Sequence, residues 1–300
     1  MLKFRIVSFP LLIGLLALIF FSPRPISVCV FTFCAVVMIG MAAFECARMV
    51  NDGLVPCFPR TAGWLAAMFV AVTLVQLLAY AVVRSGAALA NVRQAAYAIW
   101  VLLVMICAFL PWIATVFGGA ETAKKGFTTV AVVWATIVPF GMVAVLYNPE
   151  PKFLFFVMLV TKAMDTGGYV FGMLSNKLLP GGNHKLCPSI SPKKSWEGFF
   201  GGVFLALLTA WALRAIFPGW NFSRYLGPFA WWKEIVLAIL LALASIAGDL
   251  TESALKRKCG VKDSGNLIPG MGGPLDVLDS FIYVAPVCLA FSKLIFTFKL

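Results

Sequence analysis

The chain has 300 residues, enough for two ordinary soluble domains, but 62% of them are hydrophobic and only 12% are charged. Soluble proteins of this size carry charge on about a quarter of their residues. The composition therefore excludes an ordinary soluble protein, and the mean hydropathy of +0.96 indicates surfaces that face lipid. The net charge of +12 is typical of proteins that meet anionic lipid headgroups. We expect no nucleic-acid binding, because the short polar segments cannot build a fold for it.

Apolar runs of about 20 residues, the length that crosses a ~30 Å hydrocarbon core, recur along the chain and predict an all-α, polytopic integral membrane helical bundle. The predicted spans, about nine, are approximately 4–22, 26–47, 62–83, 95–117, 126–147, 152–174, 197–217, 233–252 and 276–297. Lys3 and Arg5 precede the first run as they would in a signal peptide. No small-x-small cleavage site follows it, so we expect this first helix to be retained.

The distribution of Lys and Arg predicts the orientation of the bundle. With nine spans and the N-terminus inside, fourteen basic residues lie on the inner side, nine lie on the outer side and Lys162 lies in a span. This excess favours an N-in/C-out arrangement in the cell inner (cytoplasmic) membrane. Two basic loops, about 175–196 and 253–275, then lie on the cytosolic side.

The cysteine and histidine content argues against a structural zinc site. The eight cysteines are scattered without C-x-x-C spacing, and His184 is the single histidine of the chain. We interpret the cysteines as small buried hydrophobic residues, and we assign no role to His184.

The two halves of the chain differ in character. Residues 1–150 are predicted to form N-terminal transmembrane scaffold helices, and residues 151–300 a C-terminal transmembrane catalytic region with cytosolic basic loops. Glu45 and Arg48 are the ionisable exception within the first half; their i,i+3 spacing predicts an ion pair near the membrane interface.

Ionisable side chains at the ends of the C-terminal spans indicate a functional site, since charge at such depths is costly. They are Lys162, Asp165, Asp249, Glu252, Asp276 and Asp279. Asp249 and Glu252 are spaced i,i+3, as are Asp276 and Asp279, so each pair shares a helix face. Clustered oxygen ligands without His or Cys suit Mg²⁺ better than zinc.

The two basic loops have features of a polyphosphate site. In the first, Ser191 is predicted to cap a helix that has Pro192 at its first position, which would place free backbone N–H groups beside Lys193 and Lys194. The second loop carries Lys256-Arg257-Lys258 and Lys262-Asp263 and ends in Gly272-Gly273. Glycines there would let the backbone approach a ligand closely. No G-x-x-x-x-G-K-[ST] sequence is present, which excludes a P-loop ATPase.

Residues 253–279 resemble the long motif of the phosphatidate cytidylyltransferase (CDP-diacylglycerol synthase) family. That motif reads S-x-x-K-R-x4-K-D-x-G-x2-hydrophobic-P-x-H-G-G-x2-D-R-x-D, and nearly every polar element is present at the right spacing. The upstream segments Asp165–Tyr169 and Ser191–Phe199 are also similar to family motifs. Two positions depart from the motif: Met271 replaces the His and Val277 replaces the Arg.

The resemblance implies a Mg²⁺-dependent reaction of CTP with phosphatidic acid at the lipid bilayer, giving CDP-diacylglycerol and pyrophosphate. It implies catalytic roles for Asp249, Asp276, Asp279 and Lys256, with Asp249, Asp276 and Asp279 as metal ligands. The substrate-binding residues expected are Lys162, Asp165, Ser191, Lys193, Lys194, Arg257, Lys262, Asp263, Gly272 and Gly273. A second cation and a homodimer both stay open.

Three alternative functions remain at this point. A cytidylyltransferase acting on another lipid or isoprenoid phosphate would satisfy the same motif. A secondary transporter would also carry intramembrane charges, although no internal repeat is visible. Asp165-Thr166-Gly167 matches the tripeptide of aspartic proteases, but the chain lacks the β-rich setting of that motif and the G-x-G-D form at Asp249.

Overall fold

The computed structural model describes residues 13–82, 87–147, 151–220, 231–265, 267 and 272–298. The chain forms two compact units. The N-terminal unit comprises Met1–Ala144 together with Lys258–Leu278, and the C-terminal unit comprises Val145–Arg257 together with Asp279–Leu300. The segment Lys258–Leu278, which holds much of the family-like motif, is therefore built into the same unit as the first helices.

Long helices make up the N-terminal unit. Residues 13–21 are helical, and α2 (Arg24–Gly53), α3 (Pro59–Val82) and most of α4 (Ala87–Tyr147) follow, with the short α9 (Pro274–Leu278) added from the far end of the chain. Helix α2 has Pro25 in its first turn, a position where the missing N–H costs nothing. It packs along α3 and against α9. Gly40 and Gly63 permit a close approach of α2 and α3, since a Cβ at either would press on the other helix.

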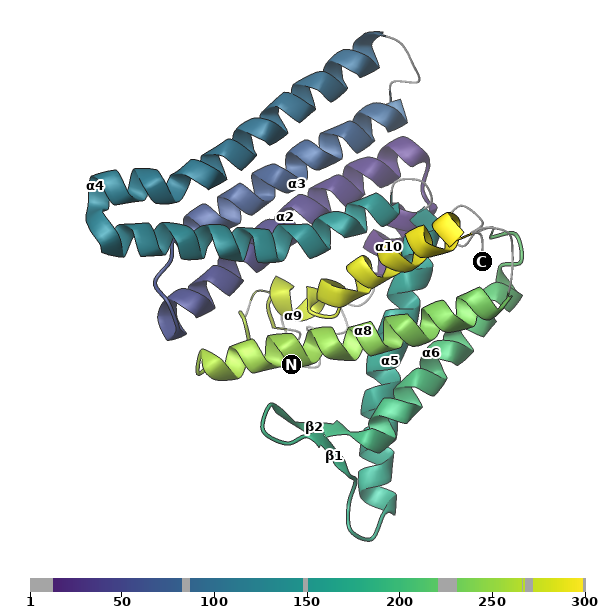
Figure 1. Cartoon of the computed structure of the whole chain (residues 1–300). Coiled ribbons are helices and arrows are strands. Elements are labelled where there is room, and N and C mark those ends of the chain that lie inside the picture. Colours follow the sequence, from purple (N-terminus) through teal and green to yellow (C-terminus); the bar gives the residue numbers. More distant parts are fainter. Residues whose placement is uncertain are drawn as a thin grey trace. The chain divides into compact units, whose positions relative to one another are not determined.

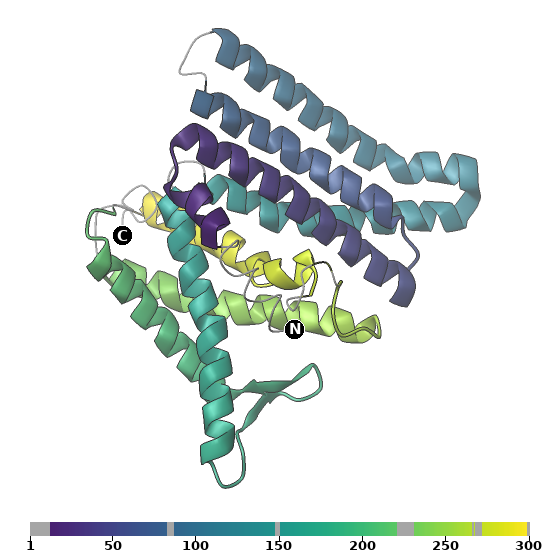
Figure 2. The ribbon, with the colours of Figure 1, turned by 180° about the vertical axis from the view of Figure 1, so that it is seen from behind.

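Helix α4 is divided into two limbs. Gly119 has φ 70° and ψ −169°, which is not helical and is a conformation that glycine adopts readily. The chain reverses near there, so the two limbs of α4 run in opposite directions and diverge from the turn (Figures 1 and 2). Helix α4 contains two apolar stretches of membrane length, Gln94–Pro111 and Val116–Val143, and Gly119 lies near the start of the second.

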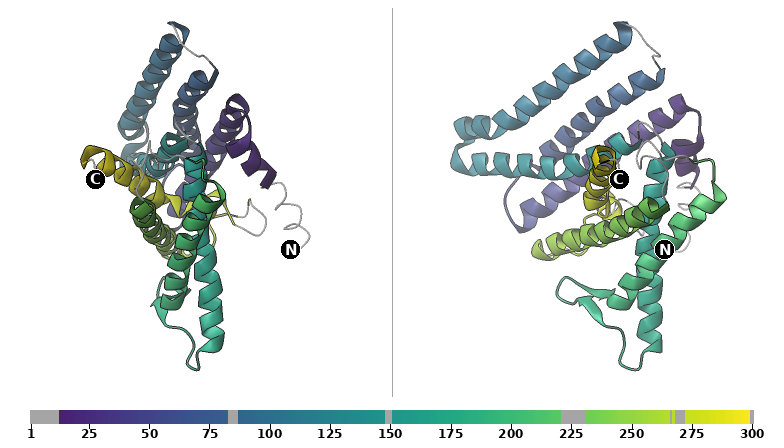
Figure 3. Two further views of the ribbon diagram at one scale, coloured as in Figure 1. Left: turned by 90° about the vertical axis from the view of Figure 1, so that its right-hand side faces the viewer. Right: turned by 45° about the vertical axis from the view of Figure 1, so that its right-hand side comes forward.

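The C-terminal unit consists of α5 (Pro151–Leu178), the strands β1 (Lys185–Cys187) and β2 (Ser191–Ser195), α6 (Trp196–Ile216), α8 (Trp231–Lys258) and α10 (Phe281–Phe298). Helices α5 and α6 form an antiparallel pair whose connection carries the β-hairpin (Figures 1 and 3). Glycines permit this pairing: a Cβ at Gly167 would clash with the backbone of Gly201 and Gly202. Gly248 likewise lets α8 approach the backbone of Asp279 and Ser280 at the start of α10.

The small antiparallel hairpin corrects the prediction that Ser191 caps a helix. Strand β2 pairs with β1 in the register Lys185↔Ser195 and Cys187↔Ser191, which keeps Ser191–Ser195 extended. Helix α6 begins only at Trp196, and its N-cap is Ser195, whose Oγ accepts the N–H of Gly198 at 3.1 Å. The strand pairing delays the helix by four residues, so Lys193 and Lys194 lie on a strand.

Seven of the described helices are long and apolar enough to cross a membrane, which confirms a polytopic helical membrane protein. They are Arg24–Gly53, Gln94–Pro111, Val116–Val143, Pro151–Leu178, Trp196–Ile216, Trp231–Lys258 and Pro274–Leu294. The predicted third span lies in α3 (Pro59–Val82), which includes the apolar helical stretch Pro59–Val75. Much of the predicted first span lies outside the described residues. The number nine and the N-in/C-out orientation therefore stay predictions.

All eight cysteines are free thiols, and five of them are buried. Cys57, in the loop after α2, donates its Sγ–H to the carbonyl of Ala47 at 2.8 Å and its backbone N–H to Asn51 Oδ1 at 3.1 Å. Burial raises the pKa of the Cys57 thiol to about 11. This thiol therefore stays protonated at neutral pH and belongs to the packing of the N-terminal unit.

Candidate active site

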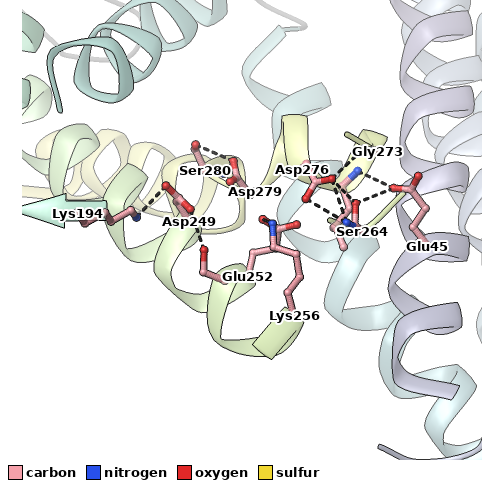
Figure 4. A network of polar contacts seen from close by, with 12 residues as sticks. Glu45, Lys194, Asp249, Glu252, Lys256, Ser264, Gly273, Asp276, Asp279 and Ser280 are labelled. Atoms are coloured by element: carbon pink, nitrogen blue, oxygen red, sulfur yellow. Dashed lines mark hydrogen bonds and ion pairs between the residues drawn. The ribbon is translucent and has the colours of Figure 1, made fainter. Parts of the chain in front are cut away.

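The C-terminal unit places Lys194 of β2 against Asp249 near the C-terminal end of α8. The Nζ of Lys194 lies 2.8 Å from Asp249 Oδ2 (Figure 4), and Ser253 Oγ donates to Asp249 Oδ1 at 3.2 Å. Both charged side chains are largely shielded from solvent, at 19% and 35% exposure. Partial shielding strengthens such a pair relative to one in water. The sequence predicted both residues as site residues without predicting that they pair.

A cavity of about 260 Å³ opens beside this pair. It is lined by Met164, Asp165, Gly168, Tyr169, Ser191, Lys193, Lys194, Ser195, Gly198, Phe199, Ile246 and Asp249. Five of the predicted site residues of this unit thus meet at one hollow, contributed by α5, β2 and α8. Lysines at one wall and the exposed aromatic ring of Tyr169 at another suit an anionic ligand with a planar or apolar part.

Asp279 precedes α10 and is buried, with 9% of its surface exposed. Its Oδ1 accepts hydrogen bonds from the N–H of Ser280 at 2.5 Å and from the Oγ of Ser280 at 3.0 Å. The carboxylates of Asp279 and Asp249 are close enough for their charges to interact. The close approach at Gly248 makes this possible, because it brings the start of α10 onto α8.

Asp165 lies in α5 and links three helices of the C-terminal unit. Its Oδ1 accepts the hydroxyl of Ser245 at 2.9 Å from α8, and its Oδ2 accepts Lys162 Nζ at 3.1 Å and the hydroxyl of Ser280 at 3.4 Å. The carboxylate thus orients groups next to Asp249 and Asp279 as well as lining the cavity. Lys162 and Asp165, both predicted to bind substrate, form an ion pair across one turn of α5.

Asp276 belongs to the N-terminal unit, where it organises the loop before α9. Its Oδ2 accepts the N–H and Oγ–H of Ser264 at 3.1 and 2.8 Å and the N–H of Gly273 at 2.8 Å (Figure 4). Gly272 has φ +88°, in the left-handed region that favours glycine, and a Cβ there would collide with the Asp276 carboxylate. Gly272, predicted to let the backbone approach a ligand, thus leaves room for this carboxylate.

Glu45 of α2 lies beside this loop, and the sequence predicted a different partner for it. The predicted pairing with Arg48 is wrong: Arg48 Nε lies 3.9 Å from Asp52 Oδ2 on the exposed face of α2. Glu45 is buried at 6% exposure and accepts the Ser264 hydroxyl at 3.2 Å and the N–H of Leu275 at 3.1 Å. Those partners lie 219 and 230 residues away, a separation that no helix-face pattern can reveal.

The remaining predicted residues lie near the end of α8 and in the loop that follows it. Lys256 Nζ contacts Glu252 Oε2 at 3.0 Å, and Glu252 is buried at 2% exposure. Arg257, Lys262 and Asp263 are exposed. Met271 lies outside the described residues, and Val277 is a partly exposed residue of α9. Lys256 is thus held by a carboxylate one turn away, whereas the charges that follow it are open to solvent.

The donor chemistry of the C-terminal unit fits Mg²⁺. Among the residues that the structure describes, no three His, Cys, Asp or Glu side chains form a closed cage for a metal ion. Magnesium is usually held by one or two carboxylates, with water and substrate phosphate oxygens completing an octahedron. Asp249, which lines the cavity, and Asp279, whose charge interacts with that of Asp249, supply two such carboxylates.

Comparison with known proteins identifies the family of the chain. Residues 3–295 match the model of the cytidylyltransferase family. The chain belongs to that family. The resemblance inferred from residues 253–279 is thereby confirmed, and it extends over the first helices, where no motif was recognised.

Curated members of the cytidylyltransferase family match part of the chain. Phosphatidate cytidylyltransferase of Staphylococcus saprophyticus is 42% identical over 135 residues, which is 45% of this chain and 46% of that protein. The enzyme of the same name from Staphylococcus epidermidis is 39% identical over 136 residues, 45% of this chain and 47% of its own length. The chain spans about half the length of the curated relatives it matches.

Proposed function

We propose that this protein transfers the cytidylyl group of CTP to phosphatidic acid, giving CDP-diacylglycerol and pyrophosphate. The observation that carries the proposal is the cavity of the C-terminal unit, where Lys194 pairs with Asp249 at 2.8 Å in a chain of the cytidylyltransferase family. The relatives named phosphatidate cytidylyltransferase support phosphatidic acid as the lipid substrate.

The reaction brings two anions together, so positioning and neutralisation of charge supply most of the catalysis. An oxygen of the lipid phosphate attacks the α-phosphorus of CTP in line, and pyrophosphate leaves from the opposite side. Lys193 and Lys194 bind the phosphates at the cavity. Arg257 at the end of α8 and Lys262 in the loop that follows it add positive charge. The attacking oxygen is already ionised, so the reaction needs no strong general base. The replacement of the family His by Met271 is compatible with that chemistry.

In this proposal the residues that hold the cation in the C-terminal unit are Asp249 and Asp279. A bound Mg²⁺ would neutralise charge on the phosphates and on the leaving pyrophosphate. Asp276, three residues before Asp279, stays the third predicted ligand, and a second cation stays open. Ser253 orients Asp249 through its 3.2 Å hydrogen bond, and Ser280 orients Asp279.

The lipid end of the cavity is formed by α5. Lys162 and Asp165 lie one turn apart, and the side chain of Tyr169 is 70% exposed one turn further along. We propose that the lipid phosphate enters here, next to a helix that is itself of membrane length. The same proposal includes nine spans, the N-in/C-out orientation and a site that faces the cytosol in the inner membrane.

The test is CTP turnover by the purified protein in detergent, with phosphatidic acid and with or without Mg²⁺, following pyrophosphate and the CDP-lipid product. We expect Mg²⁺-dependent formation of CDP-diacylglycerol. Parallel assays with an isoprenoid phosphate identify another lipid acceptor. Pyrophosphate release from that acceptor alone, or no release from folded protein with either acceptor, contradicts the proposal.

A further inference from the structure

Glu45 is the buried carboxylate of the N-terminal unit that the proposed chemistry leaves without a role. It lies in α2, with 6% of its surface exposed. A carboxylate at such a site is stabilised only if hydrogen-bond donors replace the water that it has lost. The donors here are the backbone N–H of Leu275 and the hydroxyl of Ser264, both from the segment that carries the family motif.

The loop is shaped around the Glu45 carboxylate. A Cβ at Gly265 would collide with Glu45 Oε1, and a Cβ at Gly273 would collide with both carboxylate oxygens. Two of the glycines in the motif are therefore required by the presence of Glu45. The carboxylate occupies the space that side chains at those two positions would take, with loop backbone on both sides of it.

Ser264 connects Glu45 to Asp276. Its hydroxyl lies 2.8 Å from Asp276 Oδ2 and 3.2 Å from Glu45 Oε2 (Figure 4). A hydroxyl has one proton to donate, so Ser264 shares it between the two carboxylates, with the shorter contact to Asp276. Glu45 also holds the N–H of Leu275, next to the Pro274 that starts α9. The orientation of Asp276 thus depends on a bridge, Glu45–Ser264–Asp276, and on the helix start that Glu45 holds.

We propose that Glu45 is a positioning residue: from α2 it fixes the two ends of the loop, Ser264–Gly265 and Gly273–Leu275, and through Ser264 it sets the orientation of the Asp276 carboxylate. Its consequence for catalysis rests on the proposed cytidylyl transfer, whereas its effect on the loop does not. Residues that orient a ligating carboxylate typically change metal affinity or activity about 10- to 100-fold when removed.

The test compares Glu45→Gln and Glu45→Ala with Asp52→Asn in the full-length protein. Asp52 lies on the same helix with 61% of its side chain exposed, so its variant loses the same charge without touching the loop. Hydrogen exchange at the amides of Ser264 and Leu275, measured without substrate, reports the loop. We expect exchange about 10-fold faster or more in Glu45→Ala, a smaller change in Glu45→Gln, which keeps an acceptor oxygen, and none in Asp52→Asn.

Turnover supplies the second measurement. We expect Glu45→Ala to lower kcat and to raise the Mg²⁺ concentration for half-maximal rate about 10-fold or more, with a smaller change in the KM for CTP. Unchanged loop exchange in both Glu45 variants overturns the inference, whatever the activity. If Glu45→Ala also makes amides of α6 exchange faster, the variant is destabilised beyond the loop. Glu45→Gln is then the deciding variant, and loop exchange at the wild-type rate in it counts against the inference. If the Glu45 variants exchange the loop amides faster but the wild-type protein does not turn over CTP, the positioning role stands and the proposed function is rejected.

Discussion

Two segments that carry predicted site residues, 185–195 and 258–276, differ in construction. The first is a β-hairpin held by strand pairing and by His184, whose backbone N–H and ring Nδ1 lie 3.1 and 2.6 Å from Glu197 Oε1. Its lysines project from the strand, and Lys194 reaches Asp249. In the second, which joins α8 to α9, two carboxylates hold the backbone N–H groups of Ser264, Gly273 and Leu275.

The comparison shows two uses of a carboxylate beside basic residues. Asp276 and Glu45 accept backbone N–H groups, so removing either one disturbs the course of the chain. Asp249 instead faces a lysine at the wall of a cavity, and a lysine side chain can exchange such a partner for a ligand with little change of backbone. We therefore expect Glu45 to determine geometry, Asp249 to contact the reacting groups, and Asp276, which is also a predicted metal ligand, to do both.

The largest losses of turnover should come from substitutions of Asp249 and Asp276, which differ in their effect on the loop. Asp249→Asn and Asp276→Asn should each lower turnover about 10²- to 10³-fold, the usual cost of removing one electrostatic contact to a transition state. Only Asp276→Asn should also make the Ser264 amide exchange faster, because only Asp276 accepts that N–H. Turnover and hydrogen exchange of the two variants test this, with the exposed Glu121→Gln as control. Normal turnover of both variants at saturating Mg²⁺ would show the metal assignment to be wrong.

A smaller effect should distinguish the two neighbouring lysines of β2. Lys194→Met leaves Asp249 at the cavity without its partner, so we expect kcat/KM to fall about 10- to 100-fold, the equivalent of 1.4 to 2.8 kcal/mol. Lys193 is exposed, and Lys193→Met should chiefly raise the KM for CTP. Steady-state kinetics with both substrates varied gives the two parameters. Equal losses in kcat for the two variants would contradict the distinction.

A third prediction concerns the start of α6. Ser195→Ala removes the hydroxyl that accepts the Gly198 N–H, and the loss of such a cap typically costs about 1 kcal/mol of stability. Ser191→Ala removes a hydroxyl from the strand end instead and should leave stability within about 0.5 kcal/mol of wild type. Thermal unfolding in detergent compares the two. The same change in both variants would mean that the cap does not stabilise α6.

The smallest effect is a difference in reactivity between two cysteine thiols. Cys187 lies on the hairpin and is partly exposed, whereas Cys57 is buried with its pKa raised to about 11. A raised pKa keeps a thiol in its neutral, unreactive form at pH 7 to 9. A water-soluble maleimide should therefore modify Cys187 first, and modification of Cys57 should increase about tenfold per pH unit up to its pKa. Mass spectrometry of labelled peptides measures both sites; equal rates at pH 7 would refute the difference.

The sequence by itself determined the class of the protein. Apolar runs of membrane length predicted a polytopic helical protein because in lipid a backbone must satisfy its own hydrogen bonds. The spacing of residues 253–279 predicted the cytidylyltransferase family. The five carboxylates at the span ends and the lysines at 193 and 194 were also visible, since charge in an apolar chain stands out. These features are local in the sequence, and a local pattern is enough to recognise them.

Only the tertiary structure decided which partners these side chains have. Pairing with β1 made Ser191–Ser195 a strand and moved the helix cap to Ser195, although Ser191-Pro192 has the local chemistry of a helix start. Burial against a loop more than 200 residues away gave Glu45 its partners in place of Arg48. Both outcomes depend on segments that meet only in the folded chain. A buried carboxylate takes whichever donors the packing brings to it, because the cost of leaving it without donors exceeds any preference for a neighbour one helical turn away.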